Sequence, residues 1–164
     1  MASHSQSLAS TSVLVTGGAG FIGSSLVERL VKEGAKVRVL DNFHRGLRTN
    51  LSAVQDDIEL ITGDLLDPKI LAQSMQSMET VFHLAAVTSV PRSIQDPMLT
   101  NDVNIRGTLG LLDASRRAGV KRLVFASSSS VYGANLRVPN RESYRPRPIS
   151  PYAVSKLTGE MYLE

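Results

Sequence analysis

The feature that most constrains the fold is a glycine cluster between a strand pattern and a helix pattern. The apolar, β-branched run Val13–Val15 ends just before this cluster. Ile22, Leu26 and Leu30 then repeat every four residues, which is the spacing of one helix face. The chain therefore predicts a strand, a tight turn and a helix in that order. The glycines of the turn are Gly17, Gly20 and Gly23.

Such a turn suits the binding of a dinucleotide pyrophosphate. Its glycines let the backbone bend sharply, let a ligand approach the main chain, and let the helix pack closely on its strand. The helix N-terminus adds unpaired N–H groups and a partial positive charge. Three glycines at this spacing also occur in ordinary turns, so the cluster alone leaves both interpretations open.

Length and composition favour one soluble domain. With 164 residues, 42% of them hydrophobic, the chain can form one substantial core. We expect a domain over residues 12–164, preceded by a disordered, serine-rich tail over residues 1–11 that resembles neither a signal nor a transit peptide. No apolar run is long enough to cross a bilayer, so no membrane partner is predicted. The absence of cysteine excludes thiolate metal sites and fits a cytoplasmic location.

The net charge of +3 raises the alternative of a nucleic-acid partner. Most basic residues are scattered over predicted helix faces, and the exception is a proline-containing loop that also carries Glu142 and Tyr144. A solvated loop is favoured over nucleic-acid binding, and proximity to an anionic substrate is a third interpretation. The arginines of this loop are Arg137, Arg141, Arg145 and Arg147.

An acidic residue ends the second strand pattern. Gly34 predicts the end of the first helix, and Lys36–Leu40 alternates as a strand that reaches Asp41. Asp41 follows the glycine turn at close to the roughly 20-residue offset at which a carboxylate meets the adenosine ribose. It favours NAD over NADP, because it accepts from a 2′-hydroxyl and repels a 2′-phosphate. The alternatives are a simple turn at Asp41, or a 2′-phosphate partner in Arg45 or Arg48.

Three further strand patterns complete an alternating series of strands and helices. Helical patterns separate them, one opened by Asp67 and Pro68 and a long one from about Pro97 to Arg117. Because crossovers between parallel strands are right-handed, the series predicts an α/β, Rossmann-type doubly wound sheet in the order 3-2-1-4-5. The order reverses between strands 1 and 4, where a ligand crevice is expected. The three strands are Ile58–Ile61, Thr80–Ala86 and Arg122–Ala126.

The residues at the carboxyl ends of these strands allow more than one interpretation. Asp64 can accept from an adenine amino group or simply close a turn. Ala85 and Ala86 are small enough for a cofactor to pass close by, and the serines 127–130 form either a hydroxyl cluster or a polar loop. His83 has no partner at ligand spacing, so a packed, hydrogen-bonded histidine is favoured and no metal site is predicted. Asn104, a poor helix former, suggests a polar role within the long helix.

The last informative stretch opens a helix with Ser150 and Pro151. Tyr152 and Lys156 follow at i and i+4, so their side chains lie one turn apart on the same face. A nearby ammonium group stabilises a phenolate, which would let Tyr152 act as an acid or a base. The same pair also occurs on plain surface helices.

Together these motifs resemble the extended short-chain dehydrogenase/reductase family, in particular its NAD-dependent nucleotide-sugar epimerases. The resemblance covers nearly the whole chain. The matching stretches are Thr16–Gly23, Asp41–Asn42, Gly63–Leu65, His83–Ala86, Asn104, Ser127–Gly133 and Tyr152–Lys156.

The resemblance implies which residues bind NAD. The glycine turn with Phe21 and Ile22 would hold the pyrophosphate, Asp41 and Asn42 the ribose, and Asp64 with Leu65 the adenine. The remaining contacts would come from the second half of the sheet. The full implied set is Gly17, Gly20, Phe21, Ile22, Gly23, Asp41, Asn42, Asp64, Leu65, Ala85, Ala86, Asn104, Tyr152 and Lys156.

The resemblance also implies a reaction, the epimerisation of a UDP-hexose through a transient 4-keto sugar while NAD stays bound. Tyr152 would be the base, Lys156 its partner, and Ser128 would polarise the reacting oxygen. Ser89, Ser128, Ser129 and Tyr152 would contact the substrate. Dehydratases of the family carry acidic residues where this chain has Ser129 and Ser130, so an epimerase is favoured. A dehydratase, a reductase and a noncatalytic NAD(P)-binding module remain alternatives.

Members of this family continue beyond the Tyr–Lys helix into another strand and a smaller substrate-binding domain, and they act as homodimers. The present sequence ends at Glu164, inside that helix. We therefore expect the isolated chain to have little or no epimerase activity.

Overall fold

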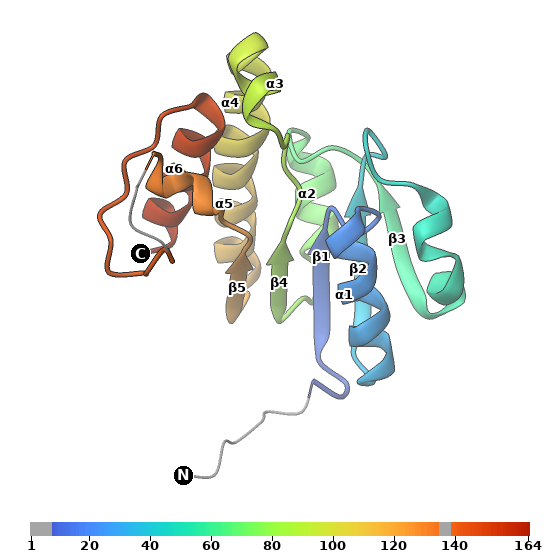
Figure 1. The fold of residues 1–164 in the computed structure, drawn as a ribbon. Helices are drawn as coiled ribbons and strands as arrows, with labels where there is room; N and C mark the ends of the chain where they lie inside the picture. Colours follow the sequence, from blue (N-terminus) through green and yellow to red (C-terminus); the bar gives the residue numbers. More distant parts are fainter. Residues whose placement is uncertain (1–7, 135–138) are drawn as a thin grey trace.

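The computed structural model describes residues 8–134 and 139–164, and its central element is a parallel sheet. The strands lie in the order β3-β2-β1-β4-β5, and each neighbouring pair is parallel (Figure 1). This order confirms the predicted Rossmann-type topology, with the reversal between β1 and β4. The strands are β1 (Ser12–Thr16), β2 (Lys36–Asp41), β3 (Ile58–Thr62), β4 (Thr80–His83) and β5 (Arg122–Phe125).

Helices cover both faces of the sheet. One face carries α1 and η1, and the other carries α2 and α5, with α6 beside α5 at the β5 end (Figure 1). The α-helices are α1 (Phe21–Lys32), α2 (Pro68–Ser74), α3 (Val90–Gln95), α4 (Pro97–Asn101), α5 (Thr108–Ala118) and α6 (Pro151–Leu163). The 3₁₀ segments are η1 (Arg48–Asp57) and η3 (Ser129–Tyr132), and η2 (Asp102–Gly107) is a π-helical segment.

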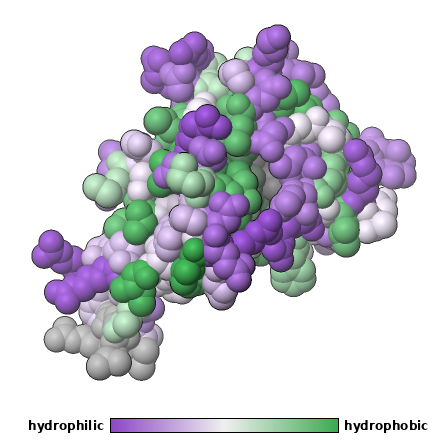
Figure 2. Space-filling model, turned by 90° about the horizontal axis from the view of Figure 1, so that it is seen from above, coloured by the Kyte–Doolittle hydropathy of each residue, from purple (hydrophilic) through white to green (hydrophobic). Residues whose placement is uncertain are grey.

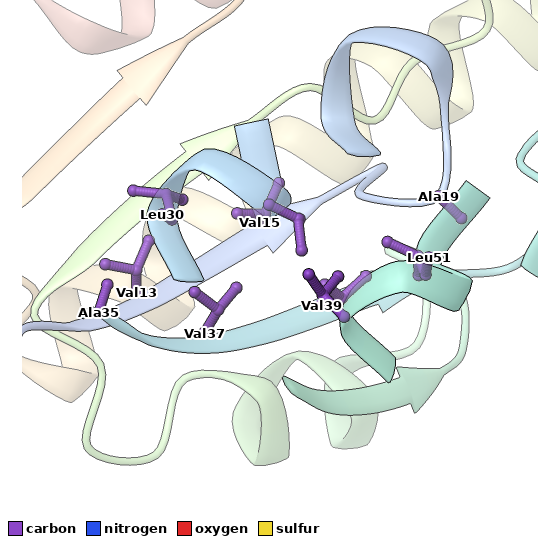
Figure 3. Packing of buried hydrophobic residues seen from close by; sticks show 10 residues of the cluster. Val13, Val15, Ala19, Leu30, Ala35, Val37, Val39 and Leu51 are labelled. Atoms are coloured by element: carbon purple, nitrogen blue, oxygen red, sulfur yellow. The ribbon is translucent and has the colours of Figure 1, made fainter. Parts of the chain in front are cut away.

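The core has two layers because successive strand residues point to opposite faces. Figure 3 shows the layer below α1, where valines of β1 and β2 pack against Leu30 of α1 and Leu51 of η1. On the other face, Leu14 and Leu40 pack with Leu111 of α5. Strands buried on both faces are typical of a parallel sheet between two helix layers.

The predicted helix signals are present. The side chain of Asp67 accepts from Lys69 N at 2.8 Å at the start of α2, and Ser150 accepts from Ala153 N at 3.1 Å at the start of α6. Gly34 follows the end of α1 with φ +80°, a left-handed conformation that favours glycine. These local rules therefore place the helix ends close to the predicted positions.

Two predicted elements differ in detail. The fourth strand ends at His83, and Ala85 N beyond it donates to the side-chain hydroxyl of Thr16 at 3.3 Å and not to a backbone carbonyl of β1. The long helix is continuous from α4 to α5 (Figure 1), but its middle, η2, is π-helical. A π-helical segment is widened by i to i+5 bonding and often marks a functional site.

Residues 8–11, which precede the predicted domain boundary at residue 12, contact the neighbouring strands and helices. Ser10 N donates to Gly34 O at 2.8 Å, Lys36 N donates to Thr11 O at 2.9 Å, and Leu8 packs on the core. Residues 1–7 lie outside the described residues, so the predicted boundary of the tail stays a prediction. Within residues 8–134 and 139–164, no helix has the length and apolar character needed to cross a membrane.

Candidate functional site

A cavity of about 640 Å³ lies along the carboxyl edge of the sheet, at the predicted reversal of strand order. Its volume lies within the range of roughly 300–1,000 Å³ that is typical of small-molecule sites. Figure 2 looks onto this edge, where apolar and hydrophilic side chains surround a central hollow. All the predicted cofactor residues line the cavity except Asn104.

The glycine turn lines the cavity, and Gly17 and Gly23 leave no room for a side chain. Gly17 has φ +69°, and a Cβ there would lie 2.7 Å from Ala85 N in the adjacent loop after β4. A Cβ at Gly23 would overlap the carbonyl oxygen of Gly17. Gly20 caps α1 without a side-chain hydrogen bond, so the first N–H groups of the helix face the cavity without a side-chain cap among the described residues. This cradle fits a pyrophosphate group.

Asp41 lines the cavity and also closes a turn. Its buried carboxylate accepts from Ala19 N at 2.9 Å and from Phe43 N at 2.8 Å, which joins the loop after β2 to the glycine turn. Each carboxylate oxygen can accept more than one bond, so capacity for a ribose hydroxyl remains. Asp64 is similar, because it accepts from Asn42 Nδ2 at 2.8 Å and from Leu66 N at 2.9 Å while lining the cavity.

The two arginines that offered a 2′-phosphate partner behave differently. Arg45 lines the cavity and is exposed. Arg48 instead stacks over Phe43, with its guanidinium carbon 4.1 Å from the ring centre, and donates to Thr62 Oγ1 at 3.0 Å. Only Arg45 of these two therefore lines the cavity.

Tyr152 and Lys156 enter the opposite end of the cavity from α6. Lys156 is buried, its Nζ donates to Ala126 O at 2.9 Å, and it lies 4.7 Å from the ring centre of Phe125. Burial lowers the pKa of Lys156 to about 8. The pair therefore places a phenol and a partly desolvated amine in the same cavity as the glycine turn.

The predicted serines do not all reach the cavity. Ser128 caps η3, where its hydroxyl accepts from Ser130 N at 3.2 Å and from Ser130 Oγ at 2.9 Å. Ser127 lines the cavity, and its hydroxyl donates to Glu160 of α6. Ser129 is exposed at the start of η3. The structure thus brings Tyr152 and Lys156 to the cavity but places Ser128 just outside its lining.

Ser89 and Asn104 also lie outside the cavity lining. Ser89 is exposed, has φ +97°, and caps α3 through a long 3.5 Å bond from Arg92 N. Asn104 is buried in η2, where its side chain accepts from Val87 N at 2.7 Å and donates to Val87 O and to Ser155 Oγ, each at 3.0 Å. Its polar role is to fix the loop after β4.

Sequence reasoning missed part of the lining. Most of the missed lining residues are neighbours in sequence of predicted site residues and lie in the same loops. Their closeness to these motifs was the one feature of the sequence that could have indicated them. Leu99 and Val103 come from α4 and η2, and nothing in their apolar spacing distinguishes them from core residues. The missed residues are Leu40, His44, Gly46, Gly63, Leu66, Leu84, Val87, Thr88, Leu99, Val103 and Ala126.

The arginine loop lies apart from the cavity lining. Arg141, Arg145 and Arg147 are exposed, whereas Arg137 falls outside the described residues. The solvated-loop interpretation stays a prediction. Among the described residues, no three histidine or acidic side chains gather in a group that could hold a metal ion.

His83 is a packed, hydrogen-bonded histidine, as predicted. It is 1% exposed, and its ring nitrogens bond to the hydroxyls of Thr16 at 2.7 Å and Thr108 at 2.9 Å. Burial, with a smaller contribution from the charge of Lys156, lowers the pKa of His83 to about 3. The imidazole is therefore neutral at neutral pH.

This buried imidazole predicts acid sensitivity. Between pH 6.5 and 3 the unfolded chain binds a proton at His83 and the folded chain does not, so stability rises with pH in this window and falls as the pH drops. We expect a loss of about 2 kcal/mol between pH 7 and pH 5, measured by urea unfolding, from a slope of roughly 1.4 kcal/mol per pH unit.

The matched variant is His83→Gln, which should lose most of this pH dependence while it starts from a lower stability. Glu79 and Asp113 contribute little between pH 7 and pH 5. Hydrogen bonds from Lys121 and from Arg116 lower their pKa values, and the stability that this adds is lost only as the pH falls below the ordinary carboxylate values of about 4. An equal pH dependence in both proteins would contradict the assignment to His83.

Comparisons with known proteins agree with this geometry. The model of the NAD dependent epimerase/dehydratase family matches residues 13–164. A UDP-glucose 4-epimerase from Mycolicibacterium smegmatis is 43% identical over 154 residues, which cover 92% of this chain and 49% of that protein. The chain thus spans about half the length of the curated relatives it matches.

Two solved structures share the fold over nearly the whole chain. One is a UDP-N-acetylglucosamine 4-epimerase from Methanobrevibacter ruminantium in complex with UDP-N-acetylmuramic acid, with 40% identity, a TM-score of 0.89, and coverage of 94% of this chain and 50% of that chain. The other is a UDP-glucose 4-epimerase from Thermus thermophilus in complex with NAD, with 43% identity, a TM-score of 0.86, and coverage of 93% and 50%. The family match over residues 13–164, together with these relatives and the cavity geometry, shows that the chain belongs to the NAD dependent epimerase/dehydratase family.

Proposed function

We propose that the protein carrying this chain is an NAD-dependent epimerase that inverts C4 of a UDP-hexose through a transient 4-keto sugar. The observation that carries the proposal is that Tyr152 and Lys156 line the same cavity as the glycine turn and Asp41. The names of the relatives support a nucleotide sugar as the substrate. This chain would supply the cofactor site and the acid–base pair.

The cavity residues fit NAD. The glycine cradle and the free N-terminus of α1 would hold the pyrophosphate, Asp41 would accept from the adenosine ribose, and Asn42, Asp64 and Leu65 would lie at the adenine. Ala85 and Ala86 leave room for the inner half of the cofactor. When bound, NAD supplies reversible hydride acceptance from the sugar carbon.

The acid–base chemistry would belong to Tyr152. Its phenolate oxygen would take the proton of the sugar 4-hydroxyl as C4 is oxidised. It would return the proton after the 4-keto sugar has rotated to present its other face to the cofactor. Lys156 would stabilise the phenolate by its charge, held in place by the carbonyl of Ala126. Ser128 would act after its hydroxyl turns from Ser130 toward the substrate.

The proposal also covers the oligomeric state, the partners and the location of the protein. Family resemblance supports a homodimer with no nucleic-acid partner. The absence of cysteine from the sequence is compatible with a cytoplasmic location. Sedimentation of the full-length protein tests the dimer directly.

The reaction is tested with the full-length protein and UDP-galactose, without added cofactor. An epimerase forms UDP-glucose and leaves no net reduced cofactor. A dehydratase instead forms a stable 4-keto-6-deoxy product, and a noncatalytic module forms neither. Either of the last two results would overturn the proposal.

Cofactor preference gives a second test. We expect NAD to bind at least about tenfold more tightly than NADP, because the Asp41 carboxylate repels a 2′-phosphate. Asp41→Asn keeps one acceptor oxygen and removes the charge, so it should narrow this ratio by about tenfold, measured by calorimetry. The control is Asp57→Asn, an exposed carboxylate at the end of η1 and outside the cavity lining. Tighter binding of NADP to the unmodified protein would show that Arg45 outweighs Asp41.

A further inference from the structure

His83 is a buried polar side chain that the proposed mechanism does not use. It is the last residue of β4, next to Thr16 at the end of β1, and it faces Thr108 at the start of α5. Its Nδ1 lies 2.7 Å from Thr16 Oγ1, and its Nε2 lies 2.9 Å from Thr108 Oγ1. One imidazole therefore bridges the sheet edge and the long helix.

The hydrogen bonds around the ring determine its tautomer. The hydroxyl of Thr108 donates its one proton to Asn104 O at 2.6 Å, so it can only accept from the imidazole. His83 Nε2 must therefore carry the proton. In a neutral ring Nδ1 is then the acceptor, and the hydroxyl of Thr16 donates to it. Thr16 Oγ1 in turn accepts from Ala85 N at 3.3 Å.

These bonds form one directed chain from Ala85 to Asn104. At the first end, Ala85 lines the cavity and lies against Gly17, where an added Cβ would come within 2.7 Å of its backbone nitrogen. This end therefore sets the spacing between the loop after β4 and the glycine turn.

The other end of the chain leads to the helix of Tyr152. Asn104 donates to Ser155 Oγ at 3.0 Å, and Ser155 Oγ donates to Tyr152 O at 2.8 Å. A second link runs through aromatic packing, because His83 and Phe125 have ring centres 5.6 Å apart and Lys156 lies over the same Phe125 ring. The imidazole thus connects both ends of the cavity.

We propose that His83 is a positioning residue. Its neutral Nε2–H tautomer, through Thr16 and Thr108, fixes the position of the glycine turn and the loop after β4 relative to α6, the helix of Tyr152 and Lys156. The kinetic consequence rests on the proposed function. The tautomer of His83 and its response to substitution do not rest on the proposed function, because both are measured in the protein without substrate.

The tautomer is tested by ¹⁵N NMR of the histidine rings in the full-length protein, with His83→Asn used to assign the His83 signals. We expect the Nε2–H form at pH 7. Thr108→Val removes the acceptor and should shift the ring toward the Nδ1–H form, with Thr16 as the new acceptor, whereas Thr108→Ser should restore Nε2–H. An Nδ1–H ring in the unmodified protein, or no change in Thr108→Val, would overturn the proposal.

The positioning role is tested by the pattern of losses. Thr16→Val and Thr108→Val should each weaken NAD binding about fivefold and lower kcat about tenfold, because either substitution interrupts the same chain of bonds through His83. In the double variant, NAD affinity and kcat should each be no lower than in the worse single variant, because one substitution already releases the chain of bonds. Losses that multiply would show two independent structural bonds and overturn the role. If the unmodified protein lacks epimerase activity, the proposed function fails, while the tautomer and the NAD affinity still decide the role of His83.

Discussion

Replacing Tyr152 with phenylalanine is expected to lower the turnover of a UDP-hexose by the full-length protein about 1,000-fold. Phenylalanine keeps the ring that packs at the cavity wall and removes the one group in the proposal that moves a proton. General acid–base catalysis contributes typically 10²–10⁴-fold, so its loss should dominate the effect. The measurement is steady-state conversion of UDP-galactose, with NAD affinity determined in parallel.

NAD affinity should change by less than about threefold in Tyr152→Phe, because the bond from the Ser155 hydroxyl to the backbone carbonyl of Tyr152 and the cap at Ser150 do not involve the phenol. Tyr162→Phe is the matched control, since Tyr162 lies on the same helix and is 46% exposed. It should retain full turnover. A Tyr152→Phe enzyme that keeps more than a tenth of its activity would show that another group moves the proton.

The sheet and the glycine turn were predictable because their signals are local. The β-branched run of β1, the glycines and the repeat of Ile22, Leu26 and Leu30 occur within a single βα unit. Right-handed crossovers then determine the strand order without any knowledge of side-chain packing. Asp41 was predictable for the same reason, since a neighbouring parallel strand must end at the same edge.

The position of Asn104 was not predictable from helical spacing. A regular helix of 3.6 residues per turn places residue faces by simple counting, but the π-helical segment Asp102–Gly107 breaks that periodicity. Val103 therefore reaches the cavity, while Asn104 turns inward to the loop after β4. Sequence spacing alone carries no signal for this change.

The serines show a second limit. A run of four hydroxyls at the end of β5 does not say which one faces the ligand, because each serine can also cap a turn. In the structure Ser128 caps η3, and Ser127 reaches the cavity wall. This choice depends on tertiary contacts, such as the bond between Ser127 and Glu160 from a helix about thirty residues away.

Replacing Gly23 with alanine is expected to weaken NAD binding about 100-fold and to destabilise the fold by about 3 kcal/mol. An added Cβ would overlap the carbonyl oxygen of Gly17 and lie 2.8 Å from Gly18 Cα. Both are backbone atoms, so no side-chain rotation can relieve the clash, and α1 must move away from the turn. The movement withdraws the helix N–H groups from the proposed pyrophosphate position.

The control for this substitution is Gly110→Ala in α5. There an added Cβ meets only the end of the Leu71 side chain, 3.3 Å away, and alanine favours the helix by up to about 1 kcal/mol. Gly110→Ala should leave NAD affinity unchanged. Calorimetry measures the NAD affinity of both variants, and urea unfolding measures their stability. If Gly23→Ala is destabilised but binds NAD normally, the turn serves only helix packing and the pyrophosphate lies elsewhere in the cavity. Because the two substitutions add the same methyl group, any difference in affinity between them reports the geometry of the turn itself.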